Sequence, residues 1–288
     1  MTAKRILLPI CTPELPLHAL EAAIVVAQEF AAHLAGVQIL TPHAEPKRFA
    51  RSELDPRHYT ELASRFISQE HQDALATRKA FEEFLSKRNM RLSNDPIGAS
   101  YATASWQEIT GDPGEVVAIY GGAFELIVLS HPKLAPASAP SSVLEAAVFG
   151  AAQPVLLAYE GFPAAQGQSI LIAWNRGVQI RRAVSAALPF LERAESAVIV
   201  NIETGAKRGP EPEEIAATLA WHGVSAEVKR IAPDRRSVGE ILVEEAREAG
   251  ANLLVMGAYS QNRMREKLIG GVTKEILVQS DFSVFMAR

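Results

Sequence analysis

ANLLVMGAY, from Ala251 to Tyr259, is a short apolar run that follows a helix-like stretch, and FELIVLSHP, from Phe124 to Pro132, has the same form. Each run is followed by a loop, a helical segment and a last apolar strand, in SSVLEAAVFGAAQPVLLAYE (141–160) and GGVTKEILVQSDFSVFMAR (270–288). The openings also match, because RILLPIC (5–11) and SILIAWN (169–175) each precede an amphipathic stretch. Such self-similarity indicates that the chain contains two copies of one unit.

The order of elements is clear in the second copy. Apolar runs at 169–174, 197–202, 225–231, 252–256 and 283–287 alternate with stretches of helical periodicity. Alternating β and α elements predict a mostly parallel sheet with helices on both faces. We therefore predict an α/β fold with two tandem, doubly wound, Rossmann-like domains related by a pseudo-two-fold axis. The expected domains are 1–159 and 169–288, with the Gly- and Pro-containing segment EGFPAAQGQ (160–168) as the linker.

The first copy contains a long insertion. An amphipathic stretch from Glu61 to Arg88 lies between the apolar runs GVQIL (36–40) and ATASWQEI (102–109). Its apolar positions fall mostly on one helical face; they are Leu62, Phe66, Leu75, Phe81, Phe84 and Leu85. We expect one extended helix that packs on the sheet or projects to a protein partner.

The composition excludes several classes of protein. The 288 residues include 29 basic and 33 acidic side chains, so the formal charge of -4 gives no reason to expect general nucleic-acid binding. Cys11 is the single cysteine, which rules out an internal disulfide or a thiolate metal cluster. No apolar run is long enough to span a bilayer, so a cytoplasmic location is the default expectation.

The segment GAYSQNRMREKLIGGVTKEIL (257–277) could form a phosphate-binding turn. Ligands of doubly wound sheets bind beyond the carboxyl ends of the strands, and Met256 and Gly257 are expected at such an end. Backbone N–H groups at a helix N-terminus favour phosphate, and Gly270, Gly271, Val272 and Thr273 would form that turn. Arg263, Arg265 and Lys267 in the loop could balance a polyphosphate. The alternative is a tight connection that binds no ligand.

A second candidate group follows the first strand of this copy. Trp174 and Asn175 end that strand, and the Asn175 side chain could hydrogen-bond a ribose or the edge of a base. An asparagine of a turn or helix cap is an equally good interpretation.

These residues resemble those of the universal stress protein family, and the whole chain outside the helical insertion is similar to a tandem, UspA-like member. Family members that bind ATP carry a glycine, two residues, a second glycine, nine residues, and then glycine followed by Ser or Thr. The spacing is kept here, at Gly257, Ser260, Gly270 and Gly271. Ser260 replaces the second glycine, and Gly271 replaces the hydroxyl residue.

The resemblance implies an adenine-nucleotide site in the second copy, for ATP, ADP or AMP, with Mg²⁺ only together with nucleotide. Asn175 stands where the family has an aspartate against the adenosine, and Ile202 stands at the aliphatic position against the adenine. The two altered motif positions would each cost about 1 kcal/mol, or together roughly thirtyfold in affinity. The first copy has Cys11 at the aspartate position and no glycine from Ser130 to Ser142, so we expect it to have lost nucleotide binding.

The family resemblance implies a stress-response protein that couples nucleotide binding to partner interactions. It also implies that the last strands pair between the two copies or between chains, in a pseudo-dimer and a homodimer. One alternative is a ligand-free scaffold whose inserted helix recruits a partner. Another is an ATP-pyrophosphatase-type hydrolase, whose glycine-rich loop after the first strand is missing at Thr12-Pro13 and Arg176-Gly177. At most weak ATP hydrolysis is expected.

No catalytic or metal-binding residue is expected elsewhere. His58 and His71 lack the spacing of a paired ligand set, and His18, His33 and His43 are expected along the first helix and its exit. We interpret these histidines, and the isolated His131 and His222, as surface residues. Trp106, Trp174 and Trp221 are interpreted as core or ligand-wall residues.

Overall fold

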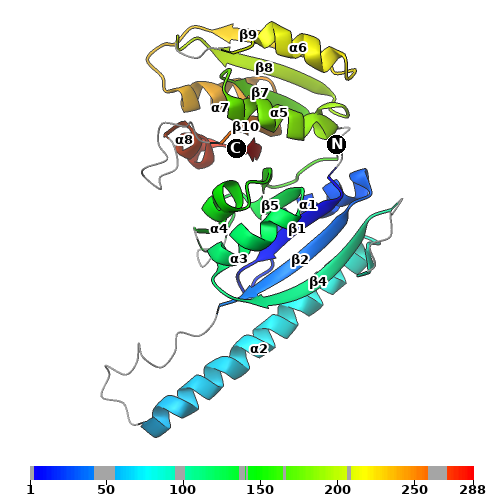
Figure 1. The fold of residues 1–288 in the computed structure, drawn as a ribbon, viewed down its shortest axis with the longest axis vertical. Coiled ribbons are helices and arrows are strands. Elements are labelled where there is room, and N and C mark those ends of the chain that lie inside the picture. Colours follow the sequence, from blue (N-terminus) through cyan, green and yellow to red (C-terminus); the bar gives the residue numbers. More distant parts are fainter. Residues whose placement is uncertain are drawn as a thin grey trace.

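The computed structural model describes residues 3–41, 56–94, 101–135, 140, 142–164, 167–205, 209–258 and 271–288, with side chains of the long helix from residue 71 onward. The described residues form one sheet of eleven strands in the order β3-β4-β2-β1-β5-β6-β11-β10-β7-β8-β9. Figure 1 shows this sheet running through the whole molecule, with the two halves stacked along the long axis. We call the part through β6 the first half and the part from β7 onward the second half.

The first half alternates strands and helices as the repeat predicts. Its strands are β1 (Arg5–Ile10), β2 (His33–Leu40), β3 (Arg91–Leu92), β4 (Thr103–Thr110), β5 (Leu126–Ser130) and β6 (Val155–Ala158). Its helices are α1 (Leu17–Phe30), α2 (Pro56–Lys87), α3 (Pro113–Tyr120) and α4 (Ser142–Glu145), with a 3-10 turn at Gly121–Ala123 and a π-helical turn at Ala146–Gly150.

The second half repeats this arrangement. Its strands are β7 (Ser169–Trp174), β8 (Ser196–Ile202), β9 (Ala226–Ile231), β10 (Leu253–Gly257) and β11 (Ser283–Ala287). Its helices are α5 (Val178–Leu191), α6 (Pro212–Ala220), α7 (Val238–Glu248) and α8 (Gly271–Gln279). Strand order β9-β8-β7-β10-β11 matches β4-β2-β1-β5-β6, and all pairs within each half are parallel. The predicted α/β fold with two tandem doubly wound units is therefore confirmed, whereas the boundaries 1–159 and 169–288 stay predictions.

Helices cover both faces of the sheet. One buried cluster contains side chains of α1, α2, α5 and α6, and a second contains side chains of α3, α4, α7 and α8. The two clusters lie on opposite faces because residues that alternate along a strand, such as Ile6 and Leu7 in β1, belong to different clusters.

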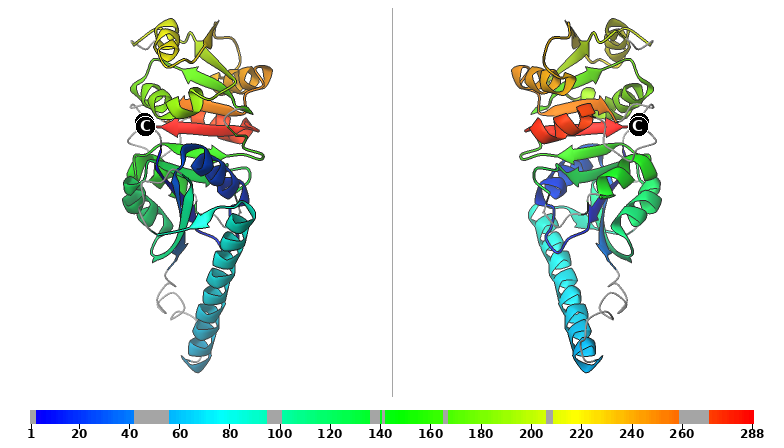
Figure 2. Two further views of the ribbon diagram at one scale, coloured as in Figure 1. Left: turned by 90° about the vertical axis from the view of Figure 1, so that its right-hand side faces the viewer. Right: turned by 90° about the vertical axis from the view of Figure 1, so that its left-hand side faces the viewer.

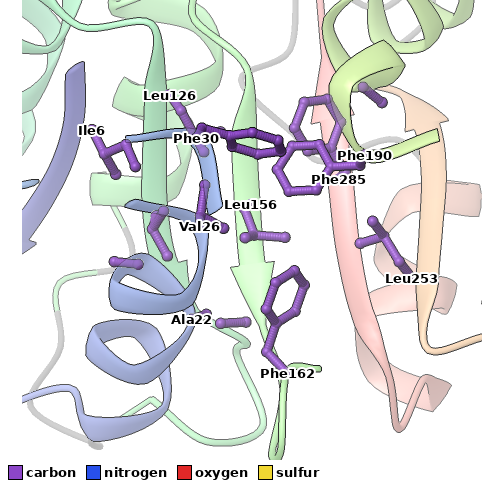
Figure 3. Packing of buried hydrophobic residues seen from close by; sticks show 14 of the residues in the cluster. Ile6, Ala22, Val26, Phe30, Leu126, Leu156, Phe162, Phe190, Leu253 and Phe285 are labelled. Carbon is purple, nitrogen blue, oxygen red and sulfur yellow. The ribbon is translucent and has the colours of Figure 1, made fainter. Parts of the chain in front are cut away.

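The halves join through one antiparallel strand pair. Val284 of β11 pairs with Leu157 of β6, and Met286 pairs with Val155, so a pseudo-two-fold axis passes close to the Leu156–Phe285 pair. Figure 3 shows Phe285 next to Phe190 and Phe30, which come from β11, α5 and α1. The ring centroid of Phe190 lies 5.6 Å from that of Phe285 and 5.1 Å from that of Phe30. Burial of these rings links the halves into one hydrophobic core.

The long helix is confirmed, and it is longer than expected. Figure 2 shows α2 extending well beyond the end of the sheet in both views. Its carboxyl-terminal part packs on the sheet through Ala74, Thr77, Phe81 and Leu85, which are all buried. The expectation that Leu75 belongs to the packed face is wrong, because its side chain is 51% exposed. Leu62 and Phe66 lie outside the described side chains.

Two histidines that were predicted at the surface are instead half-buried or buried, His33 being half-buried and His131 fully buried. His33 opens β2 instead of continuing the first helix, because the chain reverses at Ala31 in the left-handed region with φ of 48°. Its two ring nitrogens lie within hydrogen-bonding distance of Thr103 Oγ1 and Ser105 Oγ, at 2.8 and 2.9 Å. Burial lowers the pKa of His33, and the charge of Arg5 lowers it further.

His131 is the second histidine that was predicted wrongly. Its side chain is fully buried between the halves, with Nε2 3.0 Å from Ser280 Oγ and the ring edge-on to Tyr159. Ser280 Oγ also donates to the Ile276 carbonyl. Burial lowers the pKa of His131 to about 4, and the neighbouring Lys133 adds to this effect. The isolated position of His131 in the sequence gave no sign of this contact.

The buried His131 predicts loss of stability in acid. The unfolded chain protonates this histidine near its ordinary pKa of about 6.5, whereas the folded protein does so only near pH 4. Its contribution is therefore complete above pH 6.5 and is lost as the pH falls toward 4, by about 3 kcal/mol of unfolding free energy. Urea unfolding from pH 7 to pH 4 should show a steeper decline for the wild type than for His131→Gln, each referred to its own value at pH 7. Equal slopes would contradict a neutral buried imidazole.

Candidate functional site

A cavity of about 580 Å³ lies at the carboxyl ends of β7, β8 and β10. It is closed by the amino-terminal ends of α7 and α8, since Ser237, Val238, Gly271 and Thr273 line it. This is the position at which doubly wound sheets bind ligands, and the volume is in the range of small-molecule sites. We call it the second-half cavity.

Eight of the eleven residues predicted to bind a ligand line this one cavity. They are Trp174, Asn175, Ile202, Met256, Gly257, Gly271, Val272 and Thr273. Ser260, Arg263 and Gly270 lie outside the described residues. The structure thus brings together predicted residues from three strand ends and one helix end.

The walls of the cavity differ in polarity. Val200, Ile202 and Met256, on the sheet face that α7 and α8 cover, form an apolar wall together with Leu242 of α7. Polar groups stand around it at the strand ends and at the start of α7; they are Asn175, Arg176, Asn201, Glu203, Thr204 and Ser237. An apolar wall with a few polar groups is typical of sites for flat organic ligands.

Gly257 is needed for a close contact inside the protein. A Cβ atom there would lie 2.6 Å from the backbone nitrogen of Ile180 and 2.8 Å from Gln179 Cβ, both in the first turn of α5. The sequence predicted a close approach of backbone to phosphate at this glycine. What the structure shows is a close approach of β10 to α5, which fixes that helix beside the cavity.

Asn175 and Trp174 are both held by local hydrogen bonds. Asn175 Oδ1 accepts from the Gly177 N–H at 3.0 Å, so the interpretation as a turn asparagine is correct for this oxygen. The exposed side chain still has its Nδ2 group for a ligand acceptor. Trp174 is 2% exposed, and its Nε1 donates to the Pro210 carbonyl at 3.1 Å, which orients the indole as a wall.

Sequence reasoning missed Asn201, whose side chain is 3% exposed. Asn201 Nδ2 donates to the Trp174 carbonyl at 2.9 Å, while Oδ1 is buried and has no hydrogen-bond partner among the described residues. An unpaired buried oxygen is costly, at about 1–3 kcal/mol. The sequence carries a signal for Asn201, because this residue directly precedes Ile202 at a predicted strand end.

The start of α7 was also missed as part of the site, although its sequence carries a signal. Ser237 and Glu240 form a reciprocal capping box, in which the Glu240 N–H donates to Ser237 Oγ at 3.1 Å and the Ser237 N–H donates to Glu240 Oε2 at 2.7 Å. The Ser-x-x-Glu spacing before an apolar run predicts such a helix start. Because α7 begins there, its first turn faces the cavity.

Two arginines near the cavity are already paired with carboxylates. Arg176 Nη2 donates to Glu211 Oε2 at 2.7 Å, and Arg230 donates to Glu211, Glu213 and Glu203 at 2.6–3.3 Å. The pKa of the Arg230 guanidinium is raised above its usual range. The largest cause is its hydrogen bond to Glu213, and the next is its hydrogen bond to Glu211. These cations are therefore engaged with carboxylates, whereas the amino terminus of α8, whose first N–H groups have no partner within the helix, lines the cavity.

Other predicted features can be placed as well. Trp221 is 91% exposed, so its interpretation as a core or ligand-wall residue is wrong. Across the described ranges, His, Cys, Asp and Glu side chains form no group of three or more that could hold a metal ion. None of the helices that the structure describes is both long and apolar enough to cross a membrane.

Comparison with known proteins identifies the family. The model of the universal stress protein family matches residues 146–288. A universal stress protein from Archaeoglobus fulgidus DSM 4304 has a similar structure, with a TM-score of 0.64 at 12% identity over 98% of this chain and 97% of that one. A functionally unknown protein from Pseudomonas aeruginosa PAO1 gives a TM-score of 0.53 at 15% identity over 98% and 92%.

Identities this low show a shared fold over the full length and carry no statement about ligands. No curated protein sequence matches the chain. The family match covers β10, α8 and the strands and helices that line the second-half cavity. The match identifies residues 146–288, the carboxyl-terminal half of the chain, as a member of the universal stress protein family.

Proposed function

We propose that the second-half cavity binds an adenine nucleotide and that its occupancy changes how the protein interacts with partners. The observation that carries the proposal is the convergence of Asn175, Ile202, Gly257 and the α8 amino terminus on one cavity of about 580 Å³. These residues are spread over sequence positions 175 to 273, and the fold gathers them around one cavity.

The apolar wall suits a purine ring. Ile202 and Met256 are 9% and 4% exposed and present aliphatic surface to the cavity, so a flat base would bury apolar area against them. The exocyclic amino group of adenine is a hydrogen-bond donor of the kind that the buried Asn201 Oδ1 lacks. Asn175 Nδ2 is the candidate donor to the ribose.

The amino terminus of α8 suits phosphate. The first N–H groups of a helix have no partner within the helix, and those of Gly271, Val272 and Thr273 stand at the cavity. Ser260, Arg263 and Gly270 complete the proposed phosphate contacts from the segment outside the described residues. A bound Mg²⁺ would arrive with the nucleotide. The proposal assigns binding and positioning to these residues and no hydrolytic step.

Titration calorimetry of the full chain with ATP, ADP and AMP tests this proposal. Val272→Glu places a carboxylate in the first turn of α8, where Val272 is 37% exposed, and should weaken ATP binding about tenfold by charge repulsion. Val278→Glu is the matched control, because it adds the same charge to the far end of α8 at a side chain that is 61% exposed. Equal affinities for both variants, or no heat with any nucleotide at millimolar concentration, would sink the proposal.

Restoring the hydroxyl residue of the family motif should strengthen the site. Gly271→Ser is expected to tighten ATP binding about fivefold, because a hydroxyl hydrogen bond to phosphate contributes about 1 kcal/mol. A Cβ atom at this position meets no atom of the described residues within 4 Å, so the change fits without strain against them. Gly271→Ala adds the same Cβ without the oxygen and should leave the affinity nearly unchanged. If both variants gain equally, helix propensity rather than phosphate contact explains the effect.

The second candidate function is a ligand-free scaffold that recruits a protein through α2. The projection of this helix beyond the sheet favours it (Figure 2), and among the side chains of α2 that the structure describes, the first buried one is Ala74. Replacing residues 56–70 by a short Gly-Ser linker and repeating an affinity purification separates the two functions. If the linker variant loses partners that the wild type binds equally with and without ATP, the scaffold is supported. If the bound partners change with ATP in the wild type and in the linker variant alike, the nucleotide-coupled function is supported.

A further inference from the structure

A second cavity, of about 440 Å³, lies between the two halves. Its walls are the carboxyl ends of β1 and β5, at Cys11 and Ser130, together with α4 and one side of α8. We call it the first-half cavity. In the repeat, Cys11 stands at the position of Asn175 and Ser130 at that of Gly257. Within the described lining β2 contributes no residue, whereas β8 contributes several to the second-half cavity.

The lining of the first-half cavity is mostly apolar, whereas the second-half cavity has polar groups beside its apolar wall. Leu129, Val143, Leu157 and Leu277 line it. Burial raises the pKa of the Cys11 thiol to about 12, and the charge of Asp112 raises it further, so this side chain is neutral at physiological pH. A ligand here meets hydrocarbon and a neutral thiol on most sides.

One charged residue faces this cavity within the described lining. Lys274 lies on the exposed side of α8, and no ion pair joins it to another described residue. The mouth beside it also exposes apolar side chains, since Val278 is 61% exposed and Leu17, next to the lining residue Pro16, is 50% exposed. An apolar hollow with a single cation at its edge is complementary to a molecule with an apolar body and one negative group.

Phosphate does not suit the first-half cavity. Pro132 follows β5 and has no N–H group to donate, and α4 is a helix of four residues followed by a π-helical turn. A monocarboxylate needs neither a glycine turn nor a helix end, because a single lysine can neutralise it.

We propose that the first-half cavity binds a small amphipathic monocarboxylic acid, with its hydrocarbon body between β5, α4 and α8 and its carboxylate at Lys274. The site is built from both halves, because the lysine comes from α8 and the apolar walls come largely from the first half. This assignment is independent of the proposed nucleotide site, which is lined by other residues of α8, among them Thr273 and Glu275.

Calorimetry of the full chain with decanoate, and with 1-decanol as the uncharged match, tests the proposal. We expect one decanoate per chain. Lys274→Gln should weaken decanoate binding about tenfold and leave decanol binding within about twofold, since a charge-assisted hydrogen bond is lost for one ligand only. Lys274 is exposed, so the variant should unfold at the same urea concentration as the wild type.

Val278→Glu provides the second variant. It places a negative charge at the apolar mouth and should weaken decanoate binding while leaving ATP binding unchanged, so failure at this site is distinguishable from failure at the nucleotide site. The proposal is overturned if decanoate gives no heat at millimolar concentration, or if Lys274→Gln weakens both ligands equally. It is also overturned if sedimentation shows a dimer that Val278→Glu dissociates, because the mouth would then be covered by a second copy.

Discussion

Replacing Gly257 with valine is expected to lower the free energy of unfolding by about 3 kcal/mol. The new Cβ would lie 2.6 Å from the Ile180 nitrogen and 2.9 Å from the Gln179 carbonyl carbon, which are backbone atoms of the first turn of α5. Backbone atoms cannot move away as the end of a flexible side chain can, so β10 and α5 must separate. Urea unfolding followed by circular dichroism measures the loss.

The matched control is Gly271→Ala, at the glycine on the opposite wall of the same cavity. A Cβ atom there has open space among the residues that the structure describes, so stability should stay within about 0.5 kcal/mol of the wild type or rise. The close approach of β10 to α5 would be refuted by a valine variant as stable as this control.

Phe285→Ala is expected to destabilise the protein by about 4 kcal/mol. Phe285 is 1% exposed in β11, and its ring packs against Phe190, which packs against Phe30 of the other half. Truncation removes apolar contact from both halves at once and leaves a cavity at their junction. Urea unfolding should shift to lower concentration and remain a single transition, as one shared core requires.

Val278→Ala is a control of the same kind on exposed surface, and a change of about 0.5 kcal/mol or less is expected. A Phe285→Ala protein that unfolds in two separate steps, with one half retaining its wild-type stability, would contradict a core shared across β6 and β11. A loss of stability in Phe285→Ala no larger than that in Val278→Ala would also contradict the shared core.

The repeat in the sequence was sufficient to predict the two parallel, doubly wound halves of the structure. Buried parallel strands such as RILLPI (5–10) and SILIAW (169–174) are continuous apolar runs, and such runs are hard to confuse with half-exposed strands. The start of β2 was harder to place, because an alanine-rich helix runs directly into it and the reversal at Ala31 uses a non-glycine residue with positive φ.

The sequence predicted those residues of the candidate site that lie at the ends of strands. Asn175 and Ile202 follow β7 and end β8, and parallel strand ends meet at one edge of the sheet. Sequence could not show why Gly257 is glycine, because the atoms that exclude a side chain belong to α5, far away in the sequence. The same is true of His131, whose partner Ser280 is contributed by the other half.

Equilibrium dialysis of the full chain against labelled ATP tests the central claim most directly. The account predicts one nucleotide per chain, held in the second-half cavity, with an affinity about tenfold lower in Val272→Glu and unchanged in Val278→Glu. Two nucleotides per chain would contradict the loss of binding in the first half, and none at millimolar ATP would contradict the nucleotide site itself.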